Sequence, residues 1–409
     1  MDNRHYDLLH DKYHQQGRVL KYSGDSRFWS TFAVGKKEYK PLANPPPPNS
    51  MYHKYGGLIA RLELVDALVC FTYAIWIRDY AKRTCYRTSW STIEAFLAWC
   101  KQKWLSEEVI DAERSFIGLI YMIEGFIYAR KVAYLAESQL GEDVAKLYDS
   151  MRVEVDQAAT KAEQAHLSTD LNLGLMAQKA QGTPPMLPSP ASIAPTNSAN
   201  STPTTRDEGT PLPHPAAASA SQQRPPLLPG QHPIRGKLLP QRYREAPIPA
   251  DTMDAMLSVT SRVSLPFLQN IREQVNSTTA AAHCLREAQA TLNLTTLVRF
   301  FPTTFARVIN TTLLPTEEYE PDIEDEEGEL YWPGQSITGE GLGWVCLLGK
   351  AMIKEFGKAY GYKGVDGVVP KPKPEEAGPG PNGFHSQQRS GSTPQGYTPR
   401  GNSALTTPP

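Results

Sequence analysis

Residues 183–215 read TPPMLPSPASIAPTNSANSTPTTRDEGTPLPHP and decide how the rest of the chain is organised. They begin a segment, Thr183 to Pro249, in which roughly one residue in four is proline. Proline lacks a backbone N–H and has a fixed φ angle, so this density excludes helices and sheets. The segment has too few large apolar side chains to offset the entropy cost of ordering it. The sequence therefore predicts a disordered insert, placed at residues 167–250, between two folded parts.

Both flanking parts show the periodicity of amphipathic helices, in which apolar residues recur in steps of three and four. The clearest stripe consists of Leu58, Leu62, Val65, Val69, Thr72, Trp76 and Tyr80. Short loops between successive helices favour antiparallel neighbours. We therefore expect an all-α fold, an antiparallel array of TPR-like helical hairpins.

The predicted domains follow from these patterns. We expect a first helical block at residues 1–166, a second block at residues 251–362 that packs on the first, and a disordered tail at residues 363–409. Within the first block, one helix is expected to stop near Gly141, and a more polar helix at about residues 142–166 is expected to follow it.

Composition limits the classes of function. The formal net charge of −1 at pH 7 gives no global field that would favour nucleic acid or a membrane surface. The most apolar stretch, Leu58 to Ile77, carries Arg61, Glu63 and Asp66, so we expect a buried helix and no membrane span. Met1 to Leu20 is polar and charged, so no signal peptide is expected. Nucleic-acid binding is expected to be weak or absent.

The residue types that carry chemistry are scattered along the chain. The five cysteines form no CxxC pair and no cluster with zinc spacing, so we interpret them as reduced thiols in the core. His10 and His14 share a helix face, but no HExxH pattern accompanies them. The glycines from Gly339 to Gly343 lack the strand and the Lys-Ser/Thr of a phosphate-binding loop. Within the acidic loop at residues 317–329, the run Glu324 to Glu327 lacks the alternating spacing of a calcium loop. We expect no enzyme activity, no cofactor and no metal.

Aromatic and apolar side chains at helical spacing are the remaining candidates for function. Aromatics at this density belong to the core in most cases, and a dimer interface or a peptide groove explains most of the others. Small residues in the last predicted helix, Gly341 to Tyr360, favour close contact between helices. The candidate interface residues are Phe71, Trp76, Tyr80, Trp344, Leu348, Met352 and Phe356.

The order of the helices and the insert resembles the C-terminal homology domain of the AFF family, the scaffolds of the super elongation complex. The matching elements are a helix of the form x-D-A-L-x-x-F-x-x-A-I at Val65 to Ile75, an aromatic helix at Trp90 to Trp104, and a Gly-Leu-x-Trp element at residues 341–344. The Trp-Pro-Gly sequence at residues 332–334, which precedes the last helix, resembles the corresponding element of a fungal family member of the Ell-binding-protein type.

The resemblance implies a nuclear, non-enzymatic scaffold that dimerises and associates with RNA polymerase II transcription elongation, with an Ell-type elongation factor or related transcription proteins as partners. One alternative is a cytoplasmic helical-repeat adaptor that binds peptides in a groove lined by Tyr and Asn or Lys. A second alternative is an enzyme with an all-helical site, marked by convergent polar groups in a closed pocket. A flat apolar patch on the last helix would favour dimerisation.

Overall fold

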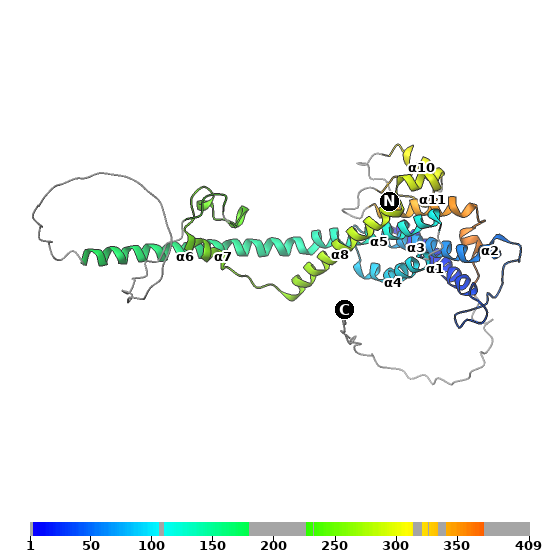
Figure 1. The fold of residues 1–409 in the computed structure, drawn as a ribbon, viewed down its shortest axis with the longest axis horizontal. Helices are drawn as coiled ribbons and strands as arrows, with labels where there is room; N and C mark the ends of the chain where they lie inside the picture. Colours follow the sequence, from blue (N-terminus) through cyan, green and yellow to red (C-terminus); the bar gives the residue numbers. More distant parts are fainter. Residues whose placement is uncertain are drawn as a thin grey trace, which may run out of the picture.

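The structure, a computed structural model, describes residues 3–105, 110–179, 226–231, 233–313, 321–325, 327–333 and 341–371. In these ranges the chain is all-α, as predicted, and its β pairing is an isolated bridge between Leu227 and Ile248. The helices, shown in Figure 1, are α1 (Asn3–Ser30), α2 (Met51–Lys54), α3 (Gly56–Ala81), α4 (Arg87–Trp104), α5 (Asp111–Leu135), α6 (Gly141–Lys179), α7 (Ala250–Leu257), α8 (Leu265–Thr291), α9 (Leu294–Phe300), α10 (Pro302–Ile309) and α11 (Leu342–Lys358).

Helices α1, α3, α4 and α5 pack in an antiparallel array. Tyr6 and Tyr13 of α1 lie against Tyr80 and Tyr73 of α3, so the contact moves backward along α3 as α1 advances. Helix α4 is antiparallel to both α3 and α5 in the same way. This arrangement is seen in the contacts Trp90–Asp79 and Cys100–Leu64 between α4 and α3, and in Lys101–Glu124 and Lys131–Glu94 between α4 and α5.

Helix α3 lies at the centre of the part we call the head, which consists of α1–α5 and α9–α11. Every residue from Leu62 to Cys70 is buried, so this stretch of α3 has no solvent-facing side. A helix that is apolar all round needs neighbours on several sides. Helices α1, α4 and α11 all pack against α3, which explains why its apolar pattern is wider than one stripe.

The second helical block packs on the first. Helix α8 runs antiparallel along α5, with Gly118 of α5 against Leu292 and Gly125 against Leu285. Helix α11 packs against both α3 and α5, and Gly349 lies between Val69 and Leu119. Glycine permits this approach, because a Cβ at Gly349 would lie 3.0 Å from a methyl carbon of Val69.

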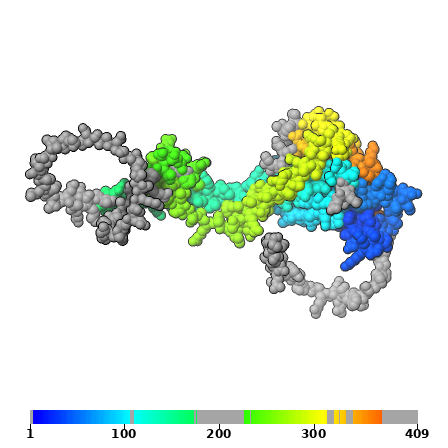
Figure 2. Space-filling model, viewed as in Figure 1, coloured from blue at the N-terminus to red at the C-terminus, as the bar shows by residue number. Residues whose placement is uncertain are grey.

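Helix α6 departs from the prediction that a new helix folds back after Gly141. A π-helical turn, Ala136–Leu140, follows α5, and Gly141 has helical backbone angles (φ −60°, ψ −45°). The chain therefore continues from α5 into α6 without a break. With its 39 residues, α6 projects away from the head as a long arm (Figure 1). The space-filling view shows this projection as narrower than the head (Figure 2).

Part of the predicted disordered insert, residues 167–250, is described by the structure. Helix α6 extends to Lys179, and only residues 180–225 and 232 of the predicted insert lie outside the described ranges. The returning chain packs on α6 in a second small core, formed by Val155, Ala159, Leu239, Tyr243, Ile248, Met253 and Met256. Pro240 and Pro249 precede a 3₁₀ turn and α7, where their missing N–H interrupts no helical hydrogen bond.

The end of the second block also differs from the prediction. Residues 359–371 follow α11 back across α3 and α1, so the chain is structured beyond residue 363, where the disordered tail was expected to begin. We call these residues the C-terminal strap. The remainder of the predicted tail, from residue 372 onward, lies outside the described residues.

Candidate functional site

The structure places most of the predicted interface inside the head. Trp76 is 2% exposed, Leu348 and Met352 are 0% exposed, and Phe356 is 9% exposed. Their positions follow from the packing of α11 against α3 and α5, which uses the apolar face that was expected to meet a second copy. These four residues are therefore core residues, and the face of α11 that carries Leu348, Met352 and Phe356 is buried.

The other three predicted residues are half-buried. Phe71 contacts the rings of His14 and Phe96, and Tyr80 stacks on Trp76 with 5.1 Å between ring centroids. Trp344 lies edge-on to Tyr331. Phe71 and Tyr80 thus line the contact between α1 and α3, where they hold two helices of the same chain together.

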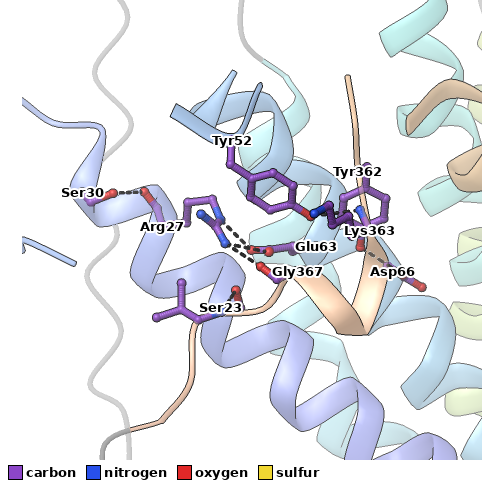
Figure 3. A network of polar contacts seen from close by, with 10 residues as sticks. Ser23, Arg27, Ser30, Tyr52, Glu63, Asp66, Tyr362, Lys363 and Gly367 are labelled. Carbon is purple, nitrogen blue, oxygen red and sulfur yellow. Dashed lines mark hydrogen bonds and ion pairs between the residues drawn. The ribbon is translucent and has the colours of Figure 1, made fainter. Parts of the chain in front are cut away.

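Polar contacts tie the C-terminal strap to α1 and α3 (Figure 3). The Tyr362 hydroxyl donates to Asp66 Oδ2 at 2.9 Å, and Lys350 Nζ lies 2.6 Å from Asp66 Oδ1. The backbone N–H of Lys363 donates to the Tyr52 hydroxyl at 2.9 Å. Burial and the nearby Asp66 carboxylate raise the pKa of Tyr362 well above its ordinary value, so this phenol stays a neutral donor.

A buried ion pair lies beside the strap (Figure 3). Arg27 and Glu63 are 4% and 0% exposed and approach to 3.2 Å. The Arg27 guanidinium also donates to the carbonyl of Gly367 at 3.0 Å and lies over the Tyr52 ring. Desolvation raises the pKa of Glu63 to about 7, although Arg27 acts in the opposite direction. The partners of Arg27 named here lie on α2, α3 and the C-terminal strap, so this network holds these parts of the chain together.

Nucleophilic and metal-binding groups do not converge in the described part of the chain. All five cysteines are buried. Burial raises the pKa of Cys85 to about 11 and those of Cys70 and Cys284 to about 12, so these thiols stay protonated near neutral pH. Among the described residues, no group of three or more His, Cys, Asp or Glu side chains is arranged to hold a metal ion.

The described part of the predicted acidic loop is held against the head. Glu324 pairs with Lys12, and Glu327 lies 3.0 Å from Lys354. The Glu329 carboxylate accepts from the Thr312 backbone N–H at 2.8 Å. Residues 317–320 and 326 of this loop lie outside the described residues. The carboxylates that are described therefore contribute to contacts within the chain.

Helix α6 carries an apolar stripe within residues 167–250, where a disordered insert was expected. Leu167, Leu171 and Leu175 are 63%, 68% and 62% exposed, and their spacing of four residues puts them on one face. The His166–Asp251 pair, at 3.2 Å, is close to the start of this stripe. Beyond it, Ser168 and Thr169 donate to the backbone of α6 itself. The regular spacing of these leucines was the signal for a helix in this region. We call Leu167, Leu171 and Leu175 the arm stripe.

Comparisons with known proteins leave the chain without an assigned family. No family model matches it, and neither a curated protein nor a solved structure matches it. None of the described helices combines the length and the apolar character that a bilayer-spanning helix requires. The surfaces of the head and the arm are therefore the basis for a functional proposal.

Proposed function

We propose that this protein is a non-enzymatic scaffold that self-associates through its arm and acts in RNA polymerase II transcription elongation in the nucleus. The transcription role and an Ell-type elongation factor as partner come from the resemblance to the AFF family. The observation that carries self-association is the arm stripe on a helix that projects from the head (Figure 1). Its three leucines are more than half exposed, whereas most large apolar side chains of the head are buried against one another.

The arm stripe favours a second copy of the same helix as the occupant. Two copies related by a two-fold axis present the same apolar face to each other, so each leucine gains a partner without a separate binding surface. Removing one leucine side chain from water contributes about 2 kcal/mol. Isolated helices are marginally stable in water, so pairing also stabilises the outer part of α6.

Size-exclusion chromatography with light scattering tests the self-association. The wild-type chain is compared at several concentrations with Leu171→Asp/Leu175→Asp and with Asn172→Asp, a matched change beside the stripe. We expect a dimer for the wild type and for Asn172→Asp, and a monomer for the double variant. A wild-type monomer at every concentration would overturn the proposal, and a double variant that stays dimeric would remove the arm stripe from it.

The transcription role needs a separate test. Titration calorimetry of the purified chain with a purified Ell-type elongation factor is expected to show saturable heat. Absence of that heat would remove the assignment to elongation, whether or not the chain dimerises. The peptide-binding adaptor would then be the leading alternative, because the head also carries half-exposed aromatic side chains beside lysines.

A further inference from the structure

A cluster of aromatic rings lies where the C-terminal ends of α1 and α4 meet. Phe28 lies 5.4 Å from Trp29, 5.4 Å from Phe32 and 6.0 Å from Trp99, measured between ring centroids. Trp29 and Phe32 stack at 5.6 Å. All four side chains are partly exposed. Phe28, Trp29 and Phe32 belong to neither of the two apolar cores, so the packing of the fold does not account for them.

Lysine side chains lie over these rings. The Lys103 ammonium is 4.2 Å from the centre of Phe28, 5.1 Å from Trp99 and 5.6 Å from Trp29. Lys36 lies 5.8 Å from the centre of Phe32. Neither lysine forms an ion pair with a carboxylate in the described ranges, although other lysines of the head, such as Lys101, do. Partial burial lowers the pKa of Lys103.

The surrounding charges add to the positive character of this surface. The loop after α1 carries exposed Lys37 and Lys40, and the backbone N–H of Lys40 donates to the carbonyl of Trp29. The nearby acids are Glu38, which is exposed, and Asp25, which pairs with Lys21. We call Phe28, Trp29, Phe32, Lys36, Trp99 and Lys103 the aromatic–lysine patch. Its charge complement is a segment rich in carboxylates.

We propose that the aromatic–lysine patch binds an acidic peptide segment with a large apolar side chain at its centre. Tryptophan is among the residues that dominate the affinity of protein interfaces, and phenylalanine is enriched in the cores of interfaces. The rings restrict Lys103, so this ammonium loses less freedom when it pairs with a carboxylate. The apolar side chain of the peptide contacts the rings, and its flanking carboxylates pair with Lys36 and Lys103.

A peptide fits this surface better than single-stranded nucleic acid. Base stacking requires accessible ring faces. Here Trp29 and Phe32 stack on each other, and Lys103 lies over the faces of Phe28 and Trp99. The proposal goes beyond the scaffold function, because the patch lies at the end of the head opposite the end from which α5 continues into the arm.

Fluorescence anisotropy with a fluorescein-labelled peptide of sequence EDDFLEDLEE tests the proposal on the full chain. We expect saturable binding that weakens with added salt, and none for the same peptide with every acid replaced by lysine. Lys36→Gln/Lys103→Gln is expected to weaken binding roughly tenfold, as is Trp29→Ala. Lys161→Gln, an exposed lysine on α6, serves as the matched control and is expected to bind like the wild type.

Each other outcome opposes the proposal. Equal binding by the wild type and Lys36→Gln/Lys103→Gln would overturn it, as would the absence of binding. Displacement of the peptide by labelled oligo-dT that itself binds more tightly would assign the patch to nucleic acid. Circular dichroism shows whether each variant is folded. Leu171→Asp/Leu175→Asp is expected to keep its peptide affinity, so failure of the arm proposal and failure of this one give different results.

Discussion

The hydroxyl of Tyr362 donates a 2.9 Å hydrogen bond to the carboxylate of Asp66, a residue 296 positions earlier in the chain. Asp66 lies on the central helix α3, and Tyr362 lies on the C-terminal strap. The bond therefore connects the end of the described chain to the middle of the head. Lys350 of α11 shares the same carboxylate at 2.6 Å, so three separate elements meet at one buried acid.

Replacing Tyr362 by phenylalanine is expected to lower the free energy of unfolding by about 2 kcal/mol, because a buried hydrogen bond to a charged group is lost. Urea denaturation followed by circular dichroism measures the change. The matched control is Tyr360→Phe, since the Tyr360 ring packs on Tyr55 and Phe356 but no hydrogen bond of its hydroxyl is found among the described residues. Equal stability of the two variants would contradict the assigned bond.

Replacing Gly118 by alanine tests the contact between α5 and α8. The added Cβ would lie 2.6 Å from Leu292 Cβ and 2.9 Å from the Leu292 nitrogen, closer than such atoms can approach. The two helices must separate, and we expect a loss of about 1–3 kcal/mol in the free energy of unfolding. Gly35→Ala is the control, because no atom lies within 4 Å of its added Cβ. If the two variants melt alike, α8 does not lie on α5 as described.

Glu63 is expected to make stability depend on pH. Its carboxyl has an ordinary pKa of 4.5, and desolvation raises the folded-state pKa to about 7. Between these values the folded chain holds a proton that the unfolded chain has released. The protonated Glu63 carboxyl therefore contributes its full share to the free energy of unfolding below pH 4.5. This contribution, roughly 3 kcal/mol, is lost as the pH rises through 7.

Denaturation of the wild type and of Glu63→Gln across this pH range measures the effect. The stability of the wild type relative to Glu63→Gln is expected to fall as the pH rises, because glutamine does not titrate. Glu137→Gln, an exposed acid on the π-helical turn, controls for the general effect of removing a carboxylate. Parallel curves for the wild type and Glu63→Gln would show that Arg27 keeps Glu63 ionised throughout.

Cleavage within residues 200–210 tests whether the two helical blocks form one folded unit. A protease site introduced there would divide the chain between α6 and α7. Because α8 packs on α5 and α11 packs on α3, we expect the two fragments to elute together under native conditions. Separate elution of two folded fragments would contradict the packing of the second block on the first.

Sequence patterns predicted those helices correctly whose pattern is compatible with one structure only. The broad apolar pattern of Leu58 to Tyr80 predicted a buried helix, and α3 is one. The last predicted helix, Gly341 to Tyr360, corresponds closely to α11. Pro302 lies in the first turn of α10, where its missing N–H interrupts no helical hydrogen bond.

Other features depend on context that sequence patterns do not contain. Gly141 is a common type of helix end, but here its backbone N–H donates to the carbonyl of Ala136 and its backbone stays helical. Apolar residues such as Leu348 and Met352 look the same in a core and in an interface, and only the placement of α11 decides between them. The aromatic–lysine patch was missed because Phe28 and Trp99 are remote in sequence and meet through the parallel alignment of α1 and α4.

The uninterrupted passage from α5 through the π-helical turn into α6 gives the molecule a mechanical property. Helix α6 alone measures about 58 Å at 1.5 Å per residue. Its inner end is continuous with a helix that carries Phe116 and Leu119 of the core. The projecting helix α6 is thus joined to the head through the π-helical turn Ala136–Leu140. A load applied near Leu175 exerts a torque on α5, and through α5 it reaches the close contact with α8.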